Sequence, residues 1–222
     1  MKYLSFVKEI NCYCFNLPMR NCMDYCDYGN KSKVGYCVNS RDYRFNEAKR
    51  LNNEKLINGS NFENQILREI DLTRHTHFRI NSIGDFEYNQ NGIKQLEKIL
   101  NVAKKRPNLN FWITTHNDFI LYSLFPKNKK LTLKNVSIQL SHPQINEQWD
   151  KESLKFWNRK NISCTSTTIF KTKSNCHKSI NWTLDNSSCG SCTECFKQNR
   201  NTIFNLHGTY AKSRYLRFKD NE

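Results

Sequence analysis

The stretch His77-Phe78-Arg79-Ile80-Asn81-Ser82-Ile83-Gly84-Asp85-Phe86 decides the fold. Residues 77–83 are rich in β-branched and aromatic side chains, which is typical of a strand, and a Gly-Asp turn follows them. Apolar residues then recur at helical spacing until Arg106-Pro107, because proline disfavours helix in the residue before it. They are Ile93, Leu96, Ile99, Leu100 and Ala103. The stretch therefore predicts a strand, a tight turn and a helix.

The same alternation continues along the chain. We expect further strands over residues 110–114, 135–140 and 163–170, and further helices over residues 61–74, 118–125 and around 149–157. Strands that alternate with helices at this spacing are typical of parallel strands joined by crossover helices. The fold class is therefore α/β, either an open parallel sheet or a partial TIM-like barrel, with cysteine-rich ends that bind metal.

Polar side chains gather where the predicted strands end. In parallel α/β folds, function collects at the carboxyl ends of the strands. The residues there are Ser82 and Asp85, Thr115 and His116, Ser141 and His142, and Thr167 and Thr168. We predict Asp85, His116 and Ser141 as catalytic residues. The alternatives are a helix-capping role for Asp85 and a polar loop position for His116.

Ten cysteines lie in two groups of five, residues 12–37 and residues 164–195. The first residues lack the pattern of a signal peptide, and the longest apolar run, residues 119–125, is far shorter than a membrane span. We therefore expect a cytoplasmic protein without a membrane partner. In a reducing compartment, clustered cysteines indicate metal ligands before they indicate disulfides.

The carboxyl-terminal group contains the strongest local motif, Cys189-Gly-Ser-Cys192-Thr-Glu-Cys195, with Cys176 upstream. Thiolates at two-residue intervals in a tight turn can each reach a different iron of a cubane cluster. The motif predicts a 4Fe-4S cluster held by these four cysteines. A single zinc ion bound by the same residues, with His177 as a possible substitute, is the alternative.

The amino-terminal group is less regular, and we predict Cys14, Cys22 and Cys26 as metal ligands. The spacing of Cys22 and Cys26 opens the Cys-x-x-x-Cys-x-x-Cys motif of radical S-adenosylmethionine enzymes, but its third position falls on Gly29. Three alternatives remain open for this group. It forms a second metal site, it contributes ligands to the carboxyl-terminal site, or its cysteines are simply buried thiols.

Taken in order, these motifs resemble the phage "gene 88 protein" family. The resemblance rests on Cys14 with Cys22-x-x-x-Cys26, on residues 78–86 and 111–114, and on Cys176 with the terminal triplet. It covers most of the chain in short islands. It implies a phage origin and an α/β, barrel-like fold. The sequence departs from the family pattern at Thr115-His116, where a lysine is more usual.

The net charge of +15 favours a polyanionic partner over a small neutral ligand, although lysines that only keep the protein soluble are the alternative. In the tail, basic and aromatic side chains are interleaved, which suits phosphate contacts with base stacking. The predicted nucleic-acid-binding residues there are Lys212, Arg214, Tyr215 and Arg217.

These observations divide the chain into a cysteine-rich segment (1–60), a βα core (61–172) and a metal site with a basic tail (173–222). The first functional hypothesis is a phage-encoded iron–sulfur or zinc protein that engages nucleic acid, RNA above DNA, or a host nucleoprotein. Inhibition of an RNA-guided defence complex is one form of it. The second is a redox or radical-type metalloenzyme with its site at the strand ends. The third is a zinc-stabilised interaction module.

Overall fold

The computed structural model describes residues 1–7, 11–22, 43–82, 84–168, 175–176 and 192–205. Its strands are β1 (Ser5–Val7), β2 (Cys12–Phe15), β3 (His77–Ile80), β4 (Asn110–Thr115), β5 (Val136–Ile145), β6 (Ile162–Thr168) and β7 (Thr202–Asn205). Its α-helices are α1 (Tyr43–Asn58), α2 (Phe62–Thr73), α3 (Gln90–Lys105), α4 (Asp118–Leu124) and α5 (Lys151–Asn158). Two short 3-10 helices are η2 (Met19–Asn21) and η5 (Glu194–Phe196).

The seven strands form one sheet in which spatial order equals chain order, β1-β2-β3-β4-β5-β6-β7. Only the β1–β2 pair is antiparallel, and every later neighbour is parallel. The predicted α/β class with parallel strands and crossover helices is thus confirmed, and the sheet is open. The segments around the predicted core contribute to the same sheet, since β2 pairs with β3 and β7 pairs with β6.

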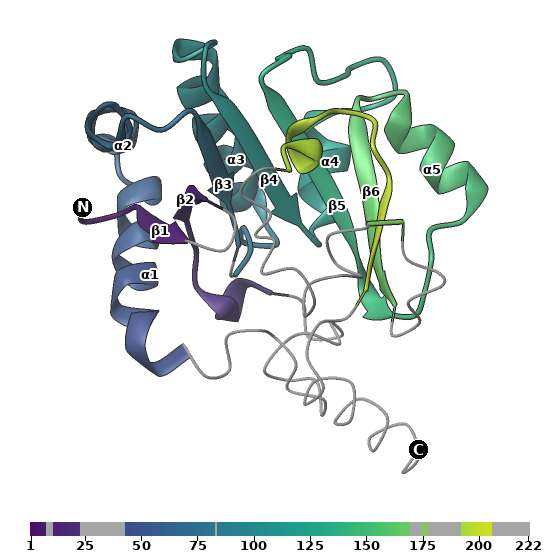
Figure 1. Cartoon of the computed structure of the whole chain (residues 1–222), viewed down its shortest axis with the longest axis horizontal. Coiled ribbons are helices and arrows are strands. Elements are labelled where there is room, and N and C mark those ends of the chain that lie inside the picture. The colour runs from purple at the N-terminus through teal and green to yellow at the C-terminus, as the bar shows by residue number, and fades with distance from the viewer. Residues whose placement is uncertain (8–10, 23–42, 83, 169–174, 177–191, 206–222) are drawn as a thin grey trace.

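Chain order in a parallel sheet has a direct structural consequence. Right-handed crossovers that step in the same direction place their helices on one side of the sheet, and this holds for the α-helices between β2 and β6. The 3-10 helix η5, in the connection between β6 and β7, lies on the other side. Figure 1 shows α3 and α4 behind the strands and η5 in front of them. Contacts run from α1 to α2, from α2 to α3 and from α3 to α4, as expected for a single helical layer.

The helical layer covers what we call the apolar face of the sheet. Because side chains alternate along a strand, the strand register assigns each residue to a face. The apolar face carries Phe78, Ile80, Phe111, Ile113, Val136, Ile138, Leu140, Ile162 and Cys164. These residues pack with Leu96, Ile99 and Val102 of α3 and with Ile120, Leu121 and Leu124 of α4 in the hydrophobic core. The core thus lies between the helices and this face.

The opposite side, which we call the polar face, has a different composition. It carries Cys12, Cys14, Arg79, Trp112, Thr114, Ser137, Gln139, Ser141, Ser163 and Thr165. Parallel strands usually present apolar residues on both faces, because helices cover both. Here Gln139, Ser137 and Ser163 are fully buried polar residues. Much of the polar face is therefore buried without being apolar, while Arg79, Thr114 and Ser141 are half-buried.

A short segment around η5 crosses the amino-terminal half of the polar face. The Phe196 ring lies edge-on to the rings of His77, at 4.6 Å, and Trp112, at 5.8 Å between centroids. The Ser137 hydroxyl donates to the Lys197 carbonyl oxygen (3.1 Å), and the Arg200 backbone N–H donates to the Ser163 hydroxyl (3.0 Å). Within the described part of the chain, these contacts cover the amino-terminal half of the polar face.

Candidate functional site at the carboxyl ends of the strands

The Gly-Asp-Phe turn after β3 joins three neighbouring loops. Gly84 has a φ of +74°, and a Cβ there would lie 1.9 Å from the Leu17 carbonyl oxygen in the loop after β2, so only glycine fits. Asp85 is buried and points to the loop after β4. Its carboxylate accepts hydrogen bonds from the Thr115 hydroxyl (2.5 Å), the His116 N–H (2.7 Å) and the Phe86 N–H (2.8 Å).

Burial raises the pKa of Asp85 to about 7, although the three hydrogen bonds oppose this shift. A carboxyl group that titrates near neutrality suits proton transfer. Its oxygens, however, already accept from one hydroxyl and two backbone donors. Through these hydrogen bonds, Asp85 connects the loop after β3 to the loop after β4.

His116 follows β4 directly and lies between the ends of β4 and β5. Its Nδ1 is 3.0 Å from the Ser141 carbonyl oxygen. A carbonyl oxygen only accepts, so in the neutral ring Nδ1 carries the hydrogen and Nε2 carries the lone pair. Burial lowers the pKa of His116 to about 4, so the ring is neutral at pH 7. Nε2 therefore has the electronic state of a general base or a metal ligand.

Ser141 completes the predicted catalytic trio, and its geometry is informative. Its hydroxyl pairs with the Thr165 hydroxyl at 2.9 Å, not with the His116 ring. Asp85 likewise accepts from the His116 backbone, not from its ring. The structure thus brings Asp85, His116 and Ser141 together at one edge of the sheet. It does not arrange them as a nucleophile, base and orienting acid.

Next to this edge, the middle of the polar face holds a stacked arginine. The Arg79 guanidinium carbon lies 4.0 Å from the centroid of the Trp112 ring, a cation–π distance. The Trp112 indole N–H donates to Gln139 Oε1 at 2.8 Å. Among the described residues, no carboxylate forms an ion pair with Arg79. The Arg79 side chain is half-buried, and its Nε is a buried atom without a hydrogen-bond partner. This is uncommon, because buried polar atoms are normally hydrogen-bonded.

The cysteines of β2 lie beside this arginine, since Cys14 pairs in register with Arg79. The sulfur atoms of Cys12 and Cys14 are 4.0 Å apart, and both side chains are buried. The hydrogen bond between them lowers the pKa of Cys14 and raises that of Cys12, and both Arg79 and the Ser82 hydroxyl add to the lowering at Cys14. Cys14 is therefore the thiol of this pair that more readily forms a thiolate.

The predicted metal ligands are only partly placed. Cys26 and Cys189 lie outside the described residues, as do Lys212, Arg214, Tyr215 and Arg217. Cys22 follows η2, Cys195 lies in η5, and the Cys176 N–H contacts the Ile203 carbonyl oxygen of β7 at 3.4 Å. Cys192 lies two residues before η5.

Thiol groups are the donors that iron–sulfur clusters and zinc prefer, so the chemistry of this set fits either centre. Within the described ranges, no three histidine, cysteine, aspartate or glutamate side chains come together as a metal site. The full ligand set therefore stays a prediction.

Arg79, Trp112 and Gln139 were not predicted from the sequence as site residues. The signal was present in the alternation of strand residues: Phe78 and Ile80 flank Arg79, and Ile138 and Leu140 flank Gln139. Buried parallel strands normally read as continuous apolar runs. Strict alternation in this fold class therefore indicates a polar interior.

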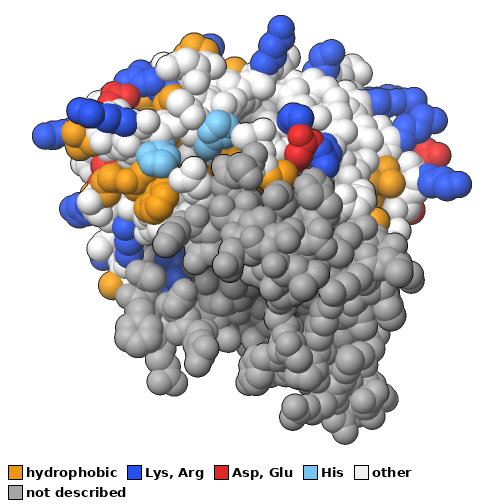
Figure 2. Space-filling view, viewed as in Figure 1, with side chains coloured by type: hydrophobic (Ala, Val, Ile, Leu, Met, Phe, Trp, Pro, Cys, Tyr) orange, Lys and Arg blue, Asp and Glu red, His pale blue; other side chains and the backbone are white. Residues whose placement is uncertain are grey.

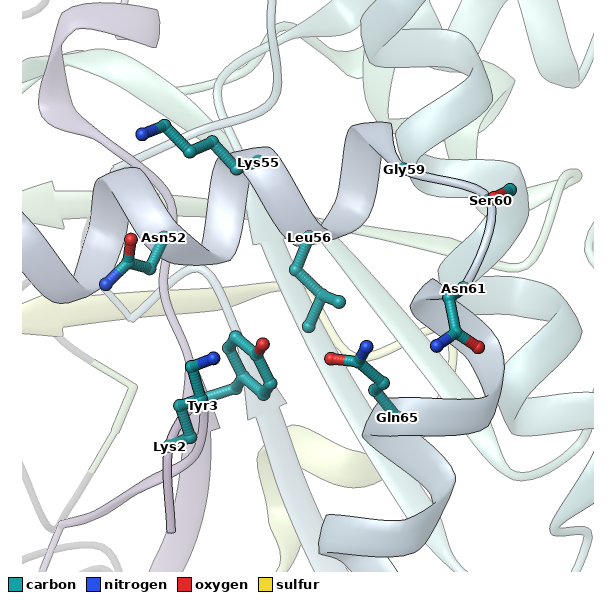
Figure 3. A pocket seen from close by; sticks show the side chains of 9 residues that line it. All are labelled: Lys2, Tyr3, Asn52, Lys55, Leu56, Gly59, Ser60, Asn61 and Gln65. Carbon is teal, nitrogen blue, oxygen red and sulfur yellow. The ribbon is translucent and has the colours of Figure 1, made fainter.

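A separate recess lies between α1, the start of α2 and the amino terminus (Figure 3). It has a volume of about 400 Å³. Its lining consists of Lys2, Tyr3, Asn52, Lys55, Leu56, Gly59, Ser60, Asn61 and Gln65. The lining contains no histidine, cysteine or carboxylate side chain, so we do not consider the recess a catalytic site.

No helix within the described ranges combines the length and apolarity that crossing a bilayer requires. Comparisons of this chain with protein-family models, with curated proteins and with solved structures found no match. The polar face and the edge formed by Asp85, His116 and Ser141 are the candidate functional site of the described residues.

Proposed function

We propose that this chain is a redox metalloenzyme that binds a small polar substrate on the carboxyl-terminal half of the polar face. One observation carries the proposal: a largely buried sheet face lined by hydroxyl, amide, thiol and guanidinium groups where a scaffold would place apolar residues. Buried polar groups without a compensating role cost stability. Their concentration at one face supports ligand binding.

The topology supports the same proposal. In parallel β/α folds with sequential strand order, catalytic residues come from the carboxyl ends of several strands. Asp85 and His116 follow β3 and β4, and Ser141 lies within β5 at the point where its register with β6 shifts. His116 is neutral at pH 7 with its lone pair on Nε2, so it is the proposed proton acceptor.

The redox part of the proposal rests on the cysteines. Cys176, Cys189, Cys192 and Cys195 would hold an iron–sulfur cluster, with zinc as the alternative and Cys14, Cys22 and Cys26 as further ligands. A bound cluster supplies one-electron transfer. The chain's own contribution is a polar interior that orients the substrate and a neutral histidine that accepts a proton.

A second candidate function has its own observation, the net charge of +15. Four exposed lysines, Lys127, Lys129, Lys130 and Lys134, lie in the loop before β5. The buried Lys160 ammonium holds this loop by donating to the carbonyl oxygens of Pro126 (2.6 Å), Lys127 (3.3 Å) and Lys129 (3.2 Å). In the view of Figure 2, lysine and arginine side chains lie along the left, upper and right margins of the described surface.

Such a surface supports binding of RNA or of a host nucleoprotein. Together with the resemblance to the phage gene 88 protein family, it supports a phage protein acting in the host cytoplasm, including inhibition of an RNA-guided defence complex. The loop enters the amino end of β5, so this surface and the proposed substrate site lie at opposite edges of the sheet.

The experiment that tests the enzyme proposal is anaerobic purification of the full chain with measurement of iron, zinc, acid-labile sulfide and the absorption spectrum. We expect iron with sulfide and a visible absorption that dithionite bleaches. A spectrum that also responds to S-adenosylmethionine would identify the radical type. Cys192→Ala removes a predicted ligand and should lose the iron. Cys164→Ala is the matched control, because Cys164 is buried on the apolar face, and it should keep the iron.

A colourless protein with stoichiometric zinc would contradict the redox enzyme and favour the interaction module. RNA that co-purifies with a metal-free protein, read from an excess of absorption at 260 nm, would favour the second candidate.

A further inference from the structure

The polar face concentrates buried atoms that lack hydrogen-bond partners. Among the described residues, seven buried side-chain nitrogen or oxygen atoms have no partner, and four of them belong to three residues of this region. They are Arg79 Nε, Asn81 Oδ1, Asn81 Nδ2 and Gln139 Nε2. More than nine in ten buried polar groups in proteins are satisfied, so a local concentration of exceptions needs an explanation.

These three residues occupy adjacent rows of the sheet. Arg79 lies on β3, in register with Trp112, and Asn81 follows the end of that strand. The Thr114 hydroxyl donates to the Asn81 carbonyl oxygen at 2.6 Å, and Thr114 pairs in register with Gln139. The unpartnered atoms thus lie from the middle of the polar face to its carboxyl edge.

The orientation of Gln139 follows from chemistry. The Trp112 indole N–H can only donate, so the amide atom that faces it is the oxygen, and the NH₂ group of Gln139 is the unpartnered end. Arg79 adds a second fixed donor, because its guanidinium is stacked on the Trp112 ring. Asn81, with 4% of its surface exposed, offers one amide donor and one carbonyl acceptor.

The set determines a ligand class. Its donors exceed its acceptors, and its only formal charge is the single positive charge of Arg79. A planar carboxylate supplies one negative charge and several acceptor lone pairs, which matches a guanidinium with two amides. A phosphate dianion would leave one negative charge uncompensated inside the protein. The unpartnered side-chain oxygen of Asn81, Oδ1, accepts a hydrogen bond, so it selects a ligand with a hydrogen-bond donor next to the carboxylate.

We propose that Arg79, Asn81 and Gln139 form the binding site for a small monocarboxylate that carries a neighbouring hydroxyl or amino group. This inference deepens the proposed enzyme function by naming its substrate class, and it rests on that function. Within the site, the carboxylate binds Arg79 and the Gln139 NH₂ group, and the neighbouring donor binds Asn81. Cys14 and Ser141 lie on the same face, and His116 lies at its carboxyl edge.

The test is isothermal titration of the full chain with three probes: sodium L-lactate, the neutral L-lactamide and inorganic phosphate. At ~10 mM probe, a site with a Kd of ~1 mM, which corresponds to about 4 kcal/mol, is measurable. We expect binding of lactate, with lactamide and phosphate bound at least ~10-fold more weakly.

Gln139→Glu is the decisive variant. The new carboxylate keeps an acceptor for the Trp112 N–H and supplies a negative charge for Arg79, so the fold is retained while a second carboxylate is repelled. We expect lactate affinity to fall at least ~10-fold. Gln65→Glu in the recess of Figure 3 introduces the same charge elsewhere and should leave the affinity unchanged. Arg79→Met is a second variant, with circular dichroism as the check on folding, and should abolish the preference for lactate over lactamide.

Absence of lactate binding, equal binding of lactamide or phosphate, or an unchanged affinity in Gln139→Glu would each overturn the site. The outcome also separates the two proposals. A chain that binds lactate but holds no iron and no redox activity keeps the carboxylate site and contradicts the redox enzyme. If the chain is a redox-active iron protein and Gln139→Glu leaves its lactate affinity unchanged, the enzyme proposal stands and the carboxylate site is contradicted.

Discussion

The two faces of one sheet differ in what their side chains do. On the apolar face, residues such as Ile113 and Ile138 are fully buried against the helical layer. On the polar face, residues such as Gln139 and Ser163 are equally buried, yet they are hydroxyls and amides. Neighbouring residues of one strand therefore face opposite environments. The difference teaches that burial alone does not identify the core of this protein. One face packs against the helices, and the other buries the polar groups that we propose bind a ligand.

The largest effect should come from the apolar face. Ile138→Ala removes a fully buried side chain from the core between β5 and the helices, and the cavity adds to the lost transfer free energy. We expect the free energy of unfolding to fall by about 2–5 kcal/mol, measured by urea denaturation at constant m-value. A loss below about 1 kcal/mol would mean that this face is not the stabilising one.

At the edge where the faces meet, Asp85→Asn should have an intermediate effect. The Asn oxygen can still accept from the Thr115 hydroxyl and the Phe86 N–H, but its NH₂ group then confronts the His116 N–H. A buried donor without a partner costs about 1–3 kcal/mol, and we expect a loss of that size. Thr114→Ser is the control. It changes the residue next to Thr115 but retains a hydroxyl group there, so it should cost less.

The same variant carries a pH signature. The pKa of Asp85 rises from 3.8 to about 7 on folding. Between these values the folded protein binds more protons than the unfolded chain, so this group makes stability fall as pH rises. Asparagine does not titrate. The stability lost in Asp85→Asn should therefore be larger at pH 5 than at pH 8 in urea denaturation, and a loss that grows with pH would contradict the raised pKa.

The alternation of strands and helices predicted most of the sheet. Residues 77–83, 110–114, 135–140 and 163–170 were expected as strands, and β3 to β6 occupy these places because their β-branched runs are long and bounded by turns. Short strands carry too few residues for such a signal. Thus β7 (Thr202–Asn205) forms because it pairs with β6, and its four residues do not indicate a strand by themselves.

The position of the candidate site could be predicted from the sequence, but the hydrogen bonds between its residues could not. The rule that parallel strands end at a common edge predicted that Asp85, His116 and Ser141 lie close together. It could not predict that Asp85 accepts from backbone N–H groups, since loop geometry decides that. The importance of Arg79 depends on the absence of a nearby carboxylate among the described residues, and only the three-dimensional arrangement reveals it.

The smallest effect should come from Asn81 at the edge of the polar face. Asn81→Gly removes two buried atoms without hydrogen-bond partners, and it places glycine at a φ of +57°, which glycine adopts without strain. The greater freedom of glycine in the unfolded chain opposes this by about 0.5–1 kcal/mol. We therefore expect the free energy of unfolding, measured by urea denaturation, to change by less than about 1 kcal/mol, although Asn81 is as buried as a core residue. A loss above about 2 kcal/mol would mean that the Asn81 amide stabilises the free protein, and the contrast between the two faces would then fail at this position.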